Sequence, residues 1–324
     1  MAMVSLVIPC YNMESFISRC IDSVLAQTHP DIQLIVVNDG STDKSEEILE
    51  QRRTEIEKKV TEYIYINQPN GGVAAACCNG FKKATGKYLI LLDSDDALLP
   101  ESIQKQHDYL EEHTDYALVR TNGWYVNEED NGQNERPFTE KTYCGVLFDD
   151  LMVGKSYNWP GSYMIRMSVL DEIYPDRNIY LTRGGQNLQF LMASAYKRKC
   201  GFILDPLMKY TIRTNSLSHF SEEYGRKQTQ ALLNYKDIRE HVIDSIVEAS
   251  EREKYHFIID MTYARIFMGH AIDIKDCEML KENFAWLKKN GFATIGDNIT
   301  YYNEVSPLVG LYYRLVNKIK RLFH

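Results

Sequence analysis

Short apolar runs alternate with helical patterns through the first part of the chain. Each run is continuously apolar and too short to span a membrane, which is typical of strands buried on both faces of a sheet. The strands predicted from these runs are residues 5–9, 32–37, 62–66 and 88–92. A helical pattern follows each of the first three runs. The first helix is expected to begin after Asn12 as its N-cap, and the next two cover about residues 42–59 and 73–85. This alternation predicts a parallel, right-handed, doubly wound sheet with helices on both faces.

Polar segments follow the predicted strands directly. They are residues 9–11, Asp39, residues 67–72 and residues 93–96. Parallel strands bring such segments to one edge of a sheet, where ligands of open α/β sheets bind. Asp39 considered alone fits a turn or a capping residue as well as a ligand contact. Its alignment with the acidic segment at residues 93–96 favours a shared ligand.

The acidic segment contains Asp93, Ser94, Asp95 and Asp96. Like charges this close together call for a compensating cation, and carboxylate oxygens suit Mg²⁺ or Mn²⁺, which also bridge to phosphate oxygens. The alternative is a solvated acidic turn that caps a helix beginning near Pro100. No glycine-rich nucleotide loop follows the first strand, so a metal and carboxylates are expected to hold the phosphates.

The second half of the chain completes the sheet and then becomes helical. A helix near residues 100–113, a strand over 116–120, a polar loop at 127–136 and a final strand over 200–213 are expected. The helices predicted after them are residues 222–249, 252–274, 276–290 and 306–323. We therefore predict two domains, residues 1–220 and a helical extension of residues 221–324.

The last predicted helix carries apolar residues on one side with basic residues interleaved. They are Leu308, Leu311, Tyr312, Leu315, Ile319 and Leu322, with Arg314, Lys318, Lys320 and Arg321. The pattern fits a helix that lies in a membrane surface near lipid-linked acceptors. It also fits a helix packed on its own domain or on another subunit, with a solvated basic face. Peripheral membrane contact and homo-oligomerisation through these helices both stay open.

Composition narrows the partners and the compartment. A net charge of −8 and a pI near 5.6 disfavour nucleic acid, because phosphate backbones need a basic face. The seven cysteines form no CxxC ladder, which fits reduced thiols. The N-terminus lacks the pattern of a secretory signal, so we expect a cytoplasmic protein, at the inner face of the plasma membrane if the last helix binds lipid.

Five motifs occur in order along the first hundred or so residues. They are VIPCYN at 7–12, VVNDGSTD at 36–43, NGG at 70–72, ATG at 84–86 and LDSDD at 92–96. Together they resemble the successive motifs of family 2 glycosyltransferases of the GT-A fold, over about residues 1–220. The fold class implied is a Rossmann-like nucleotide-sugar-binding sheet with helices on both faces, followed here by a C-terminal helical region.

The resemblance implies a nucleotide-diphosphate-sugar donor, most often a UDP-sugar, and inversion at the anomeric carbon. It implies that Pro9, Tyr11 and Asp39 cradle the uridine. Asp93 and Ser94 would approach the ribose and the sugar, and Asp95 would bind the metal. The donor-binding residues expected in all are Pro9, Tyr11, Asp39, Asn70, Gly72, Asp93, Ser94 and Arg213. On the acceptor side Trp159 could stack on a sugar, or could pack in the core or in a lid.

Several positions depart from the family pattern. Cys77-Cys78 replaces a common Arg-Asn, which removes a cation expected near the nucleotide. Arg213 stands where relatives often have histidine and could bind the diphosphate directly. The nearby His219 could reach the metal or be an ordinary loop residue.

The residues at the expected position of the general base also differ from the family pattern. Gln186 and Asn187 stand where relatives carry a carboxylate, and an amide cannot take a proton at neutral pH. Another carboxylate could act as the base, and Asp96 is the nearest candidate. Alternatively, assistance from the metal and the leaving group could suffice while an amide orients the nucleophile. As a third possibility, the chain could need a partner subunit for activity. The catalytic residues expected are Asp95, Asp96, Gln186 and Asn187.

The function predicted is a metal-dependent, inverting glycosyltransferase using Mn²⁺ or Mg²⁺. It would move a sugar from a nucleotide-diphosphate donor to a glycan, glycoprotein or lipid-linked acceptor. The alternative is a non-catalytic nucleotide-sugar-binding partner subunit of a glycosyltransferase complex. A nucleotidyltransferase is disfavoured, because its glycine-rich N-terminal loop is absent.

Overall fold

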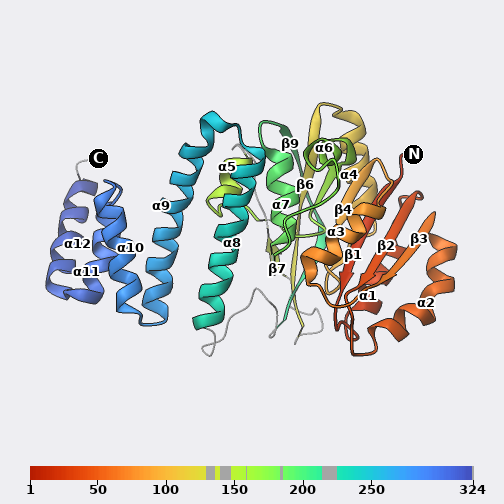
Figure 1. Ribbon diagram of the computed structural model, residues 1–324, viewed down its shortest axis with the longest axis horizontal. Coiled ribbons are helices and arrows are strands. Elements are labelled where there is room, and N and C mark those ends of the chain that lie inside the picture. Colours follow the sequence, from red (N-terminus) through yellow and green to blue (C-terminus); the bar gives the residue numbers. More distant parts are fainter. Residues whose placement is uncertain (129–135, 139–146, 158, 183–184, 214–224, 323–324) are drawn as a thin grey trace. The chain divides into compact units, whose positions relative to one another are not determined.

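The computed structural model describes residues 1–128, 136–138, 147–157, 159–182, 185–213 and 225–322 (Figure 1). The chain divides into two compact units. The first comprises Met1–Ser221 and Asp237–Val247, and the second comprises Glu222–Lys236 and Glu248–His324.

A nine-stranded mixed sheet forms the centre of the first unit. Its order is β3-β2-β1-β4-β8-β6-β9-β5, with β7 paired to β6 outside this path. Its strands are β1 Val4–Cys10, β2 Ile32–Asn38, β3 Glu62–Asn67, β4 Tyr88–Leu91, β5 Ala97–Leu98, β6 Tyr116–Asn127, β7 Arg136–Phe138, β8 Tyr163–Arg166 and β9 Lys199–Ile212. The first four strands are parallel, as predicted. The sheet becomes mixed beyond β4, because β8 runs antiparallel to both β4 and β6.

Helices cover both faces of the parallel part. Leu6 and Ile8 of β1 share a buried core with Ile17 of α1 and Leu49 of α2. On the opposite face Val7 meets α3. The helices of this unit up to β9 are α1 Ile17–Leu25, α2 Ser45–Lys59, α3 Val73–Lys83, α4 Ser102–Glu112, α5 Leu147–Met152, α6 Met167–Ile173 and α7 Gln186–Ala195. The two-faced sheet predicted from the alternating pattern is therefore present.

The N-cap predicted at Asn12 is wrong. Asn12 adopts a left-handed backbone conformation with φ 53°, and α1 begins only at Ile17. The Asn12 side-chain oxygen instead accepts a hydrogen bond from the Thr42 backbone N at 2.8 Å. The Asn12 backbone N donates to Ser41 Oγ at 3.0 Å. Asn12 thus joins the loop after β1 to the loop after β2, which a local helix signal could not indicate.

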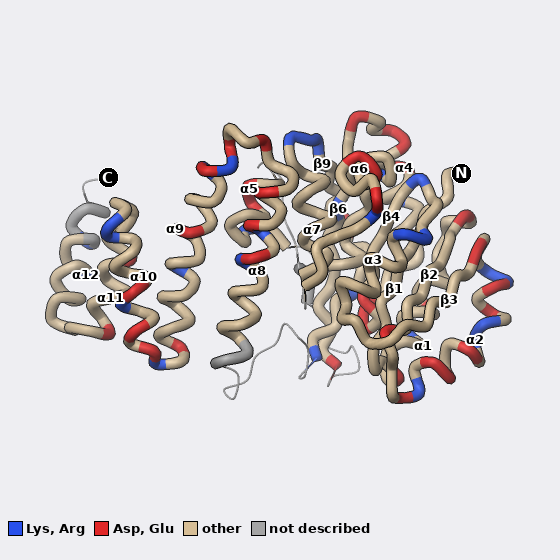
Figure 2. The backbone as a smooth tube through the Cα atoms, viewed as in Figure 1, with Lys and Arg blue, Asp and Glu red and all other residues tan. Residues whose placement is uncertain are grey.

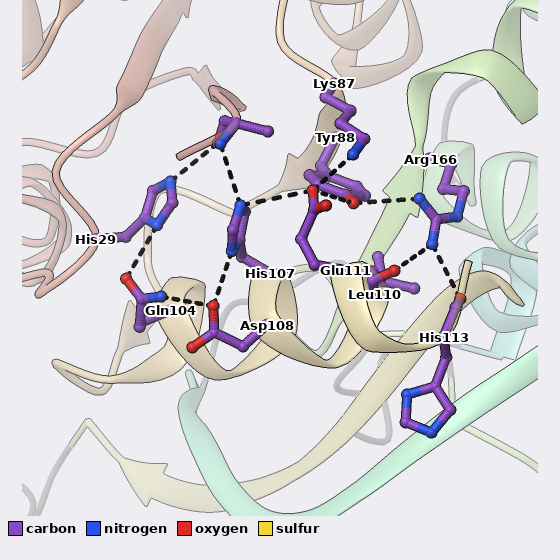
Figure 3. Close-up of polar contacts among 11 residues, drawn as sticks. His29, Lys87, Tyr88, Gln104, His107, Asp108, Leu110, Glu111, His113 and Arg166 are labelled. Carbon is purple, nitrogen blue, oxygen red and sulfur yellow. Dashed lines mark hydrogen bonds and ion pairs between the residues drawn. The ribbon is translucent and has the colours of Figure 1, made fainter.

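A polar network fixes the amino-terminal edge of the sheet, where β4 begins (Figure 3). Arg166 of β8 donates to the carbonyl oxygens of Leu110 and His113 at the end of α4. It also donates to the Tyr88 hydroxyl at 3.1 Å, and that hydroxyl donates to Glu111 at 2.8 Å. A guanidinium at a helix C-terminus satisfies carbonyls that lack intrahelical partners. This network ties α4 and β8 to β4 at the edge opposite the acidic segment.

The second unit is helical within the described residues. Its helices are α9 Ala249–Asp273, α10 Cys277–Lys289, α11 Ile295–Val305 and α12 Pro307–Leu322, while α8 Gly225–Ile246 contributes residues to both units. Helix α11 was not predicted from the sequence; it begins at a capping box formed by Thr294 and Asp297. In the described part of the chain, none of the helices combines the length and apolar composition that a membrane crossing requires.

Candidate active site

Three carboxylates meet just beyond the end of β4. The chain turns sharply there, because the Asp96 backbone N donates to the Asp93 carbonyl oxygen at 3.0 Å. Asp93, Asp95 and Asp96 each offer one carboxylate oxygen, and these oxygens lie within 4.8 Å of one another. We call these three residues the acidic cluster. Their spacing allows a single cation to contact all three side chains.

Burial makes the acidic cluster hard to ionise. Desolvation and the charge of Asp95 raise the pKa of Asp93 to about 7, against the opposing charge of Arg213. Desolvation, together with Asp95 and Asp93, raises the pKa of Asp96 well above its usual range. Desolvation also raises the pKa of Asp95, opposed by Arg213 and Arg19. A divalent cation held here would reverse this penalty, because it favours the charged carboxylates.

The two carboxylate oxygens of Asp96 differ in their hydrogen bonding. Its Oδ1 accepts a hydrogen bond from the Thr211 backbone N at 2.8 Å. Its Oδ2 is buried and has no hydrogen-bond partner among the described residues. A buried acceptor without a partner costs free energy that a ligated cation would recover. The set of carboxylate oxygens therefore fits a hard cation such as Mg²⁺ or Mn²⁺.

Two arginines approach Asp95. Arg213 Nε lies 2.7 Å from Asp95 Oδ2, at ion-pair distance but without the alignment of a hydrogen bond. Arg19 of α1 donates from Nη2 to the Asp95 carbonyl oxygen and to Thr211 Oγ1, both at 2.7 Å. The ring of Phe16 lies 5.3 Å from the Arg213 guanidinium carbon and 5.8 Å from that of Arg19. Two cations thus stand beside one of the three carboxylates.

Asp39 anchors the glycine loop that precedes α3. Its Oδ1 accepts from Gln68 Nε2 at 2.7 Å and from the Gly71 backbone N at 2.8 Å. Its Oδ2 accepts from the Gly72 backbone N at 2.8 Å. The side chain is buried, and the Asp39 backbone N donates to the Cys10 carbonyl oxygen at 2.8 Å. A nucleoside contact by Asp39 therefore has to use the lone pairs that these bonds leave.

The other residues expected on the donor side lie on the same edge of the sheet. Pro9 is buried within β1, and Tyr11 just after it is 44% exposed. Ser94 is buried inside the acidic turn, whereas Asn70 is exposed in the glycine loop. Gly40 has φ 72°, and a Cβ there would lie 2.9 Å from the Asn70 backbone N. The two loops approach this closely because Gly40 has no side chain.

Cys77 occupies the position where the family resemblance leads us to expect an arginine. It is fully buried, and desolvation together with the charge of Asp93 raises its pKa well above the usual range. The side chain is therefore a neutral thiol near the acidic cluster. Cys77 therefore supplies no positive charge near the nucleotide.

Trp159, the residue expected on the acceptor side, lies in an aromatic group. Its ring stacks on Tyr157, with centroids 4.6 Å apart and planes 13° from parallel. Tyr125 and Tyr210 contact it at centroid distances of 5.2 and 5.3 Å. The ring is half-buried, so packing accounts for part of its surface. Its contact with an acceptor sugar remains a prediction.

Gln186 and Asn187 form the first turn of α7. Gln186 is buried and Asn187 is half-buried, and the Asn187 carbonyl oxygen accepts from the Tyr163 hydroxyl at 3.3 Å. Burial, and then the charge of Asp93, raises the pKa of Tyr163 well above its usual range. Tyr163 therefore contacts the start of α7 and is close enough to Asp93 to feel its charge. His219, the other predicted metal ligand, lies outside the described residues.

Residues 5–174 match the sequence profile of glycosyl transferase family 2, which is more than half of the 324-residue chain. The chain belongs to this family. The family predicted from the five motifs is thereby confirmed.

A curated relative of this family 2 chain is the uncharacterized glycosyltransferase RC0461 of Rickettsia conorii. It is 27% identical over 293 residues, which cover 89% of this chain and 44% of the relative. The chain thus spans less than half the length of that relative.

Two solved structures resemble the family 2 chain over nearly its whole length. Residues 1–349 of S. aureus TarS in complex with UDP-GlcNAc have a TM-score of 0.64 at 16% identity, covering 99% of this chain and 92% of that one. The mannosyltransferase PcManGT of Pyrobaculum calidifontis, in complex with GDP-Man and Mn²⁺, has a TM-score of 0.57 at 12% identity, covering 98% and 86%. The likeness confirms the GT-A fold class with its C-terminal helices.

Arg19, Thr211 and Gln68 contact the candidate site and were not predicted from the sequence. Arg19 lies on an amphipathic helix, where an exposed cation is ordinary. Its contacts to residues 95 and 211 depend on the tertiary fold. The Thr211 backbone contact carries no side-chain signal at all.

Proposed function

We propose that this family 2 chain is a divalent-cation-dependent, inverting glycosyltransferase. It would use a UDP-sugar donor and a hydroxyl of a glycan, glycoprotein or lipid-linked acceptor. The observation that carries the proposal is the acidic cluster: three carboxylate oxygens, one from each residue, lie within 4.8 Å of one another, and Asp96 Oδ2 is buried without a partner in the described part of the chain. The structural neighbours in complex with UDP-GlcNAc and with GDP-Man and Mn²⁺ support it.

In this proposal the ends of β1 and β2 receive the nucleoside. Asp39 orders the glycine loop and offers its remaining lone pairs to a base or ribose hydroxyl. The exposed Tyr11 offers an aromatic face for stacking. Asn70 and Gly72 would complete the loop around the donor, and Pro9 would shape the floor beneath it.

The diphosphate would lie between the acidic cluster and the two arginines. Arg213 and Arg19 hold guanidinium groups beside Asp95, where they can donate to phosphate oxygens. Asp93, Asp95 and Asp96 would hold the cation, with Ser94 beside them inside the turn. When bound, a divalent cation would stabilise the negative charge of the departing diphosphate.

Transfer joins the acceptor oxygen to the anomeric carbon and breaks the bond from that carbon to the diphosphate oxygen. The acceptor proton must leave, and the amides of Gln186 and Asn187 cannot accept it. Asp96 is buried and tied through Oδ1 to Thr211, which suits a residue that holds the cluster. We therefore assign the orientation of the acceptor hydroxyl to Gln186 and Asn187, with the acceptor proton released to water on the side of the sugar opposite the diphosphate.

One observation favours a second candidate function. The described start of α7 carries amides where a carboxylate base is expected. A chain that binds nucleotide-sugar without turnover, as one subunit of a glycosyltransferase complex, would show this substitution together with an intact acidic cluster.

The test is release of nucleoside diphosphate from a panel of UDP-, GDP- and TDP-sugars with Mn²⁺, repeated with EDTA. We expect slow release from a UDP-sugar that EDTA and Asp95→Asn both abolish. The matched control is Asp205→Asn, an exposed aspartate paired with Lys105, which should behave as the wild type. No release from any donor alongside measurable UDP binding would favour the second candidate. Release that survives EDTA would contradict the metal dependence.

A further inference from the structure

Helix α12 packs on α11 through a glycine and a tyrosine. Tyr313 stacks on Tyr302 of α11, with ring centroids 5.5 Å apart and planes 6° from parallel. Gly310 is buried, and a Cβ there would lie 2.5 Å from Asn303 Oδ1. The two helices therefore meet at a glycine and a tyrosine pair, whereas Leu308, Leu311 and Leu315 of α12 are exposed.

Those leucines form an exposed apolar stripe on α12. Its members are Leu308, Leu311, Tyr312 and Leu315, with exposures of 83%, 48%, 62% and 54%. Their spacing of three and four residues places them on one side of the helix. A helix of a globular protein normally turns such a stripe toward the core. The reversed arrangement of α12 indicates that another surface covers the stripe.

The exposed charged side chains described on α12 are basic. Arg314 and Lys318 are exposed and follow Leu311 and Leu315 by three residues, which places them beside the stripe. The sequence after Glu304 contains no aspartate or glutamate, although the whole chain has a net charge of −8. Acidic residues are spread over other elements of the chain instead (Figure 2). The C-terminal end is thus a basic and apolar segment of an acidic protein.

We propose that α12 lies in the surface of a membrane and binds anionic phospholipid. The leucine stripe would enter the boundary between headgroups and acyl chains, and Arg314 and Lys318 would contact the anionic headgroups. A second copy of the chain fits less well. Stable protein interfaces use about 20 to 30 residues a side, and paired α12 helices would bring like charges together. The proposal does not depend on the proposed glycosyl transfer.

The test is flotation of the full chain with vesicles of phosphatidylcholine, alone or mixed with phosphatidylglycerol. We expect binding to be about tenfold stronger to the mixed vesicles and to fall with added salt. Leu308→Ser combined with Leu315→Ser should weaken it by about tenfold or more, because two exposed leucines no longer bury in lipid. Arg314→Gln combined with Lys318→Gln should weaken it several-fold and reduce its salt dependence.

The matched control is Leu204→Ser, which removes a leucine that is 60% exposed on the other unit and should leave flotation unchanged. All variants should keep the wild-type circular dichroism, because the replaced side chains are already exposed. Equal binding to both kinds of vesicle, or no effect of the leucine variant, would overturn the proposal. So would a wild-type dimer in sedimentation that the leucine variant dissociates, since the stripe would then cover a second copy.

Discussion

Among the described residues, the carboxylate of Asp39 accepts three hydrogen bonds, all from residues 68–72. An amide in its place keeps one acceptor oxygen and turns an NH₂ group toward a backbone N–H. We expect Asp39→Asn to lower the free energy of unfolding by about 1 to 3 kcal/mol, the cost of a lost buried partner. It should also weaken UDP binding, because the glycine loop loses its anchor.

Urea unfolding and calorimetric titration with UDP measure these two effects. Asp205→Asn is the control, since this exposed aspartate should contribute less than about 1 kcal/mol. A stable Asp39→Asn variant that binds UDP as the wild type does would show that the anchor does not govern the donor site.

Asn187 tests the assignment of the acceptor side. If the start of α7 faces the acceptor hydroxyl, Asn187→Asp restores a carboxylate that can take its proton. We expect nucleoside diphosphate release to rise by about twofold or more, measured as turnover at saturating donor. Asn290→Asp, at the exposed end of α10, should change nothing. A change of less than about twofold for Asn187→Asp would place the acceptor elsewhere.

We expect the acidic cluster to make the free energy of unfolding depend on pH. The pKa of Asp93 is raised to about 7, so the folded chain holds this proton more tightly than the unfolded chain does. The resulting stabilisation is complete below about pH 4 and is lost as the pH rises through about 7, a difference of at most about 4 kcal/mol. In EDTA, the wild type should therefore lose more stability between pH 5 and pH 8 than Asp93→Asn does.

Added Mn²⁺ should oppose this loss, because the cation binds the ionised carboxylates. Thermal unfolding at the two pH values, with EDTA and with Mn²⁺, measures both effects. Equal pH dependence of the wild type and Asp93→Asn would mean that the Asp93 carboxyl is not perturbed.

At the scale of elements, α3 packs on β1 through a glycine. A Cβ at Gly80 would lie 2.3 Å from Val7 Cγ1, while a Cβ at Gly269 of α9 would meet nothing within 4 Å. Alanine normally stabilises a helix over glycine by about 0.5 to 1 kcal/mol. We expect this gain for Gly269→Ala, and for Gly80→Ala a net loss of about 1 to 3 kcal/mol from overpacking. Urea unfolding of the two variants gives opposite signs; a gain for Gly80→Ala would show that α3 can move away from the sheet.

The elements that the sequence predicted well are those with long periodic patterns. β1 to β4 and α2 were expected within a few residues, because continuous apolar runs and amphipathic spacing are local signals. The two-residue β5 gives no such signal, and its strand character comes from pairing with β9. β6 continues to Asn127, beyond the predicted end at residue 120, for the same reason. The capping box of α11 was present in the sequence and would have revealed that helix.

At the scale of the whole molecule, the candidate site could be predicted only in part. The acidic cluster and Asp39 follow strands directly, and parallel pairing is enough to bring them to one edge of the sheet. The contacts of Arg19 could not be predicted, because they join residues 19, 95 and 211 across the sequence. Backbone donors determine which oxygens of Asp39 and Asp96 remain available to bind a ligand. The positions of these donors are fixed only by the fold.

The central claim is that the acidic cluster holds a divalent cation through which the nucleotide is bound. Isothermal titration of UDP into the full chain, with Mn²⁺ and then with EDTA, tests it most directly, with Asp95→Asn measured under both conditions. We predict that Mn²⁺ strengthens UDP binding to the wild type by about tenfold or more and has no effect on the variant, a coupling of about 1.4 kcal/mol or more. Equal affinity for UDP with and without Mn²⁺ would contradict the account.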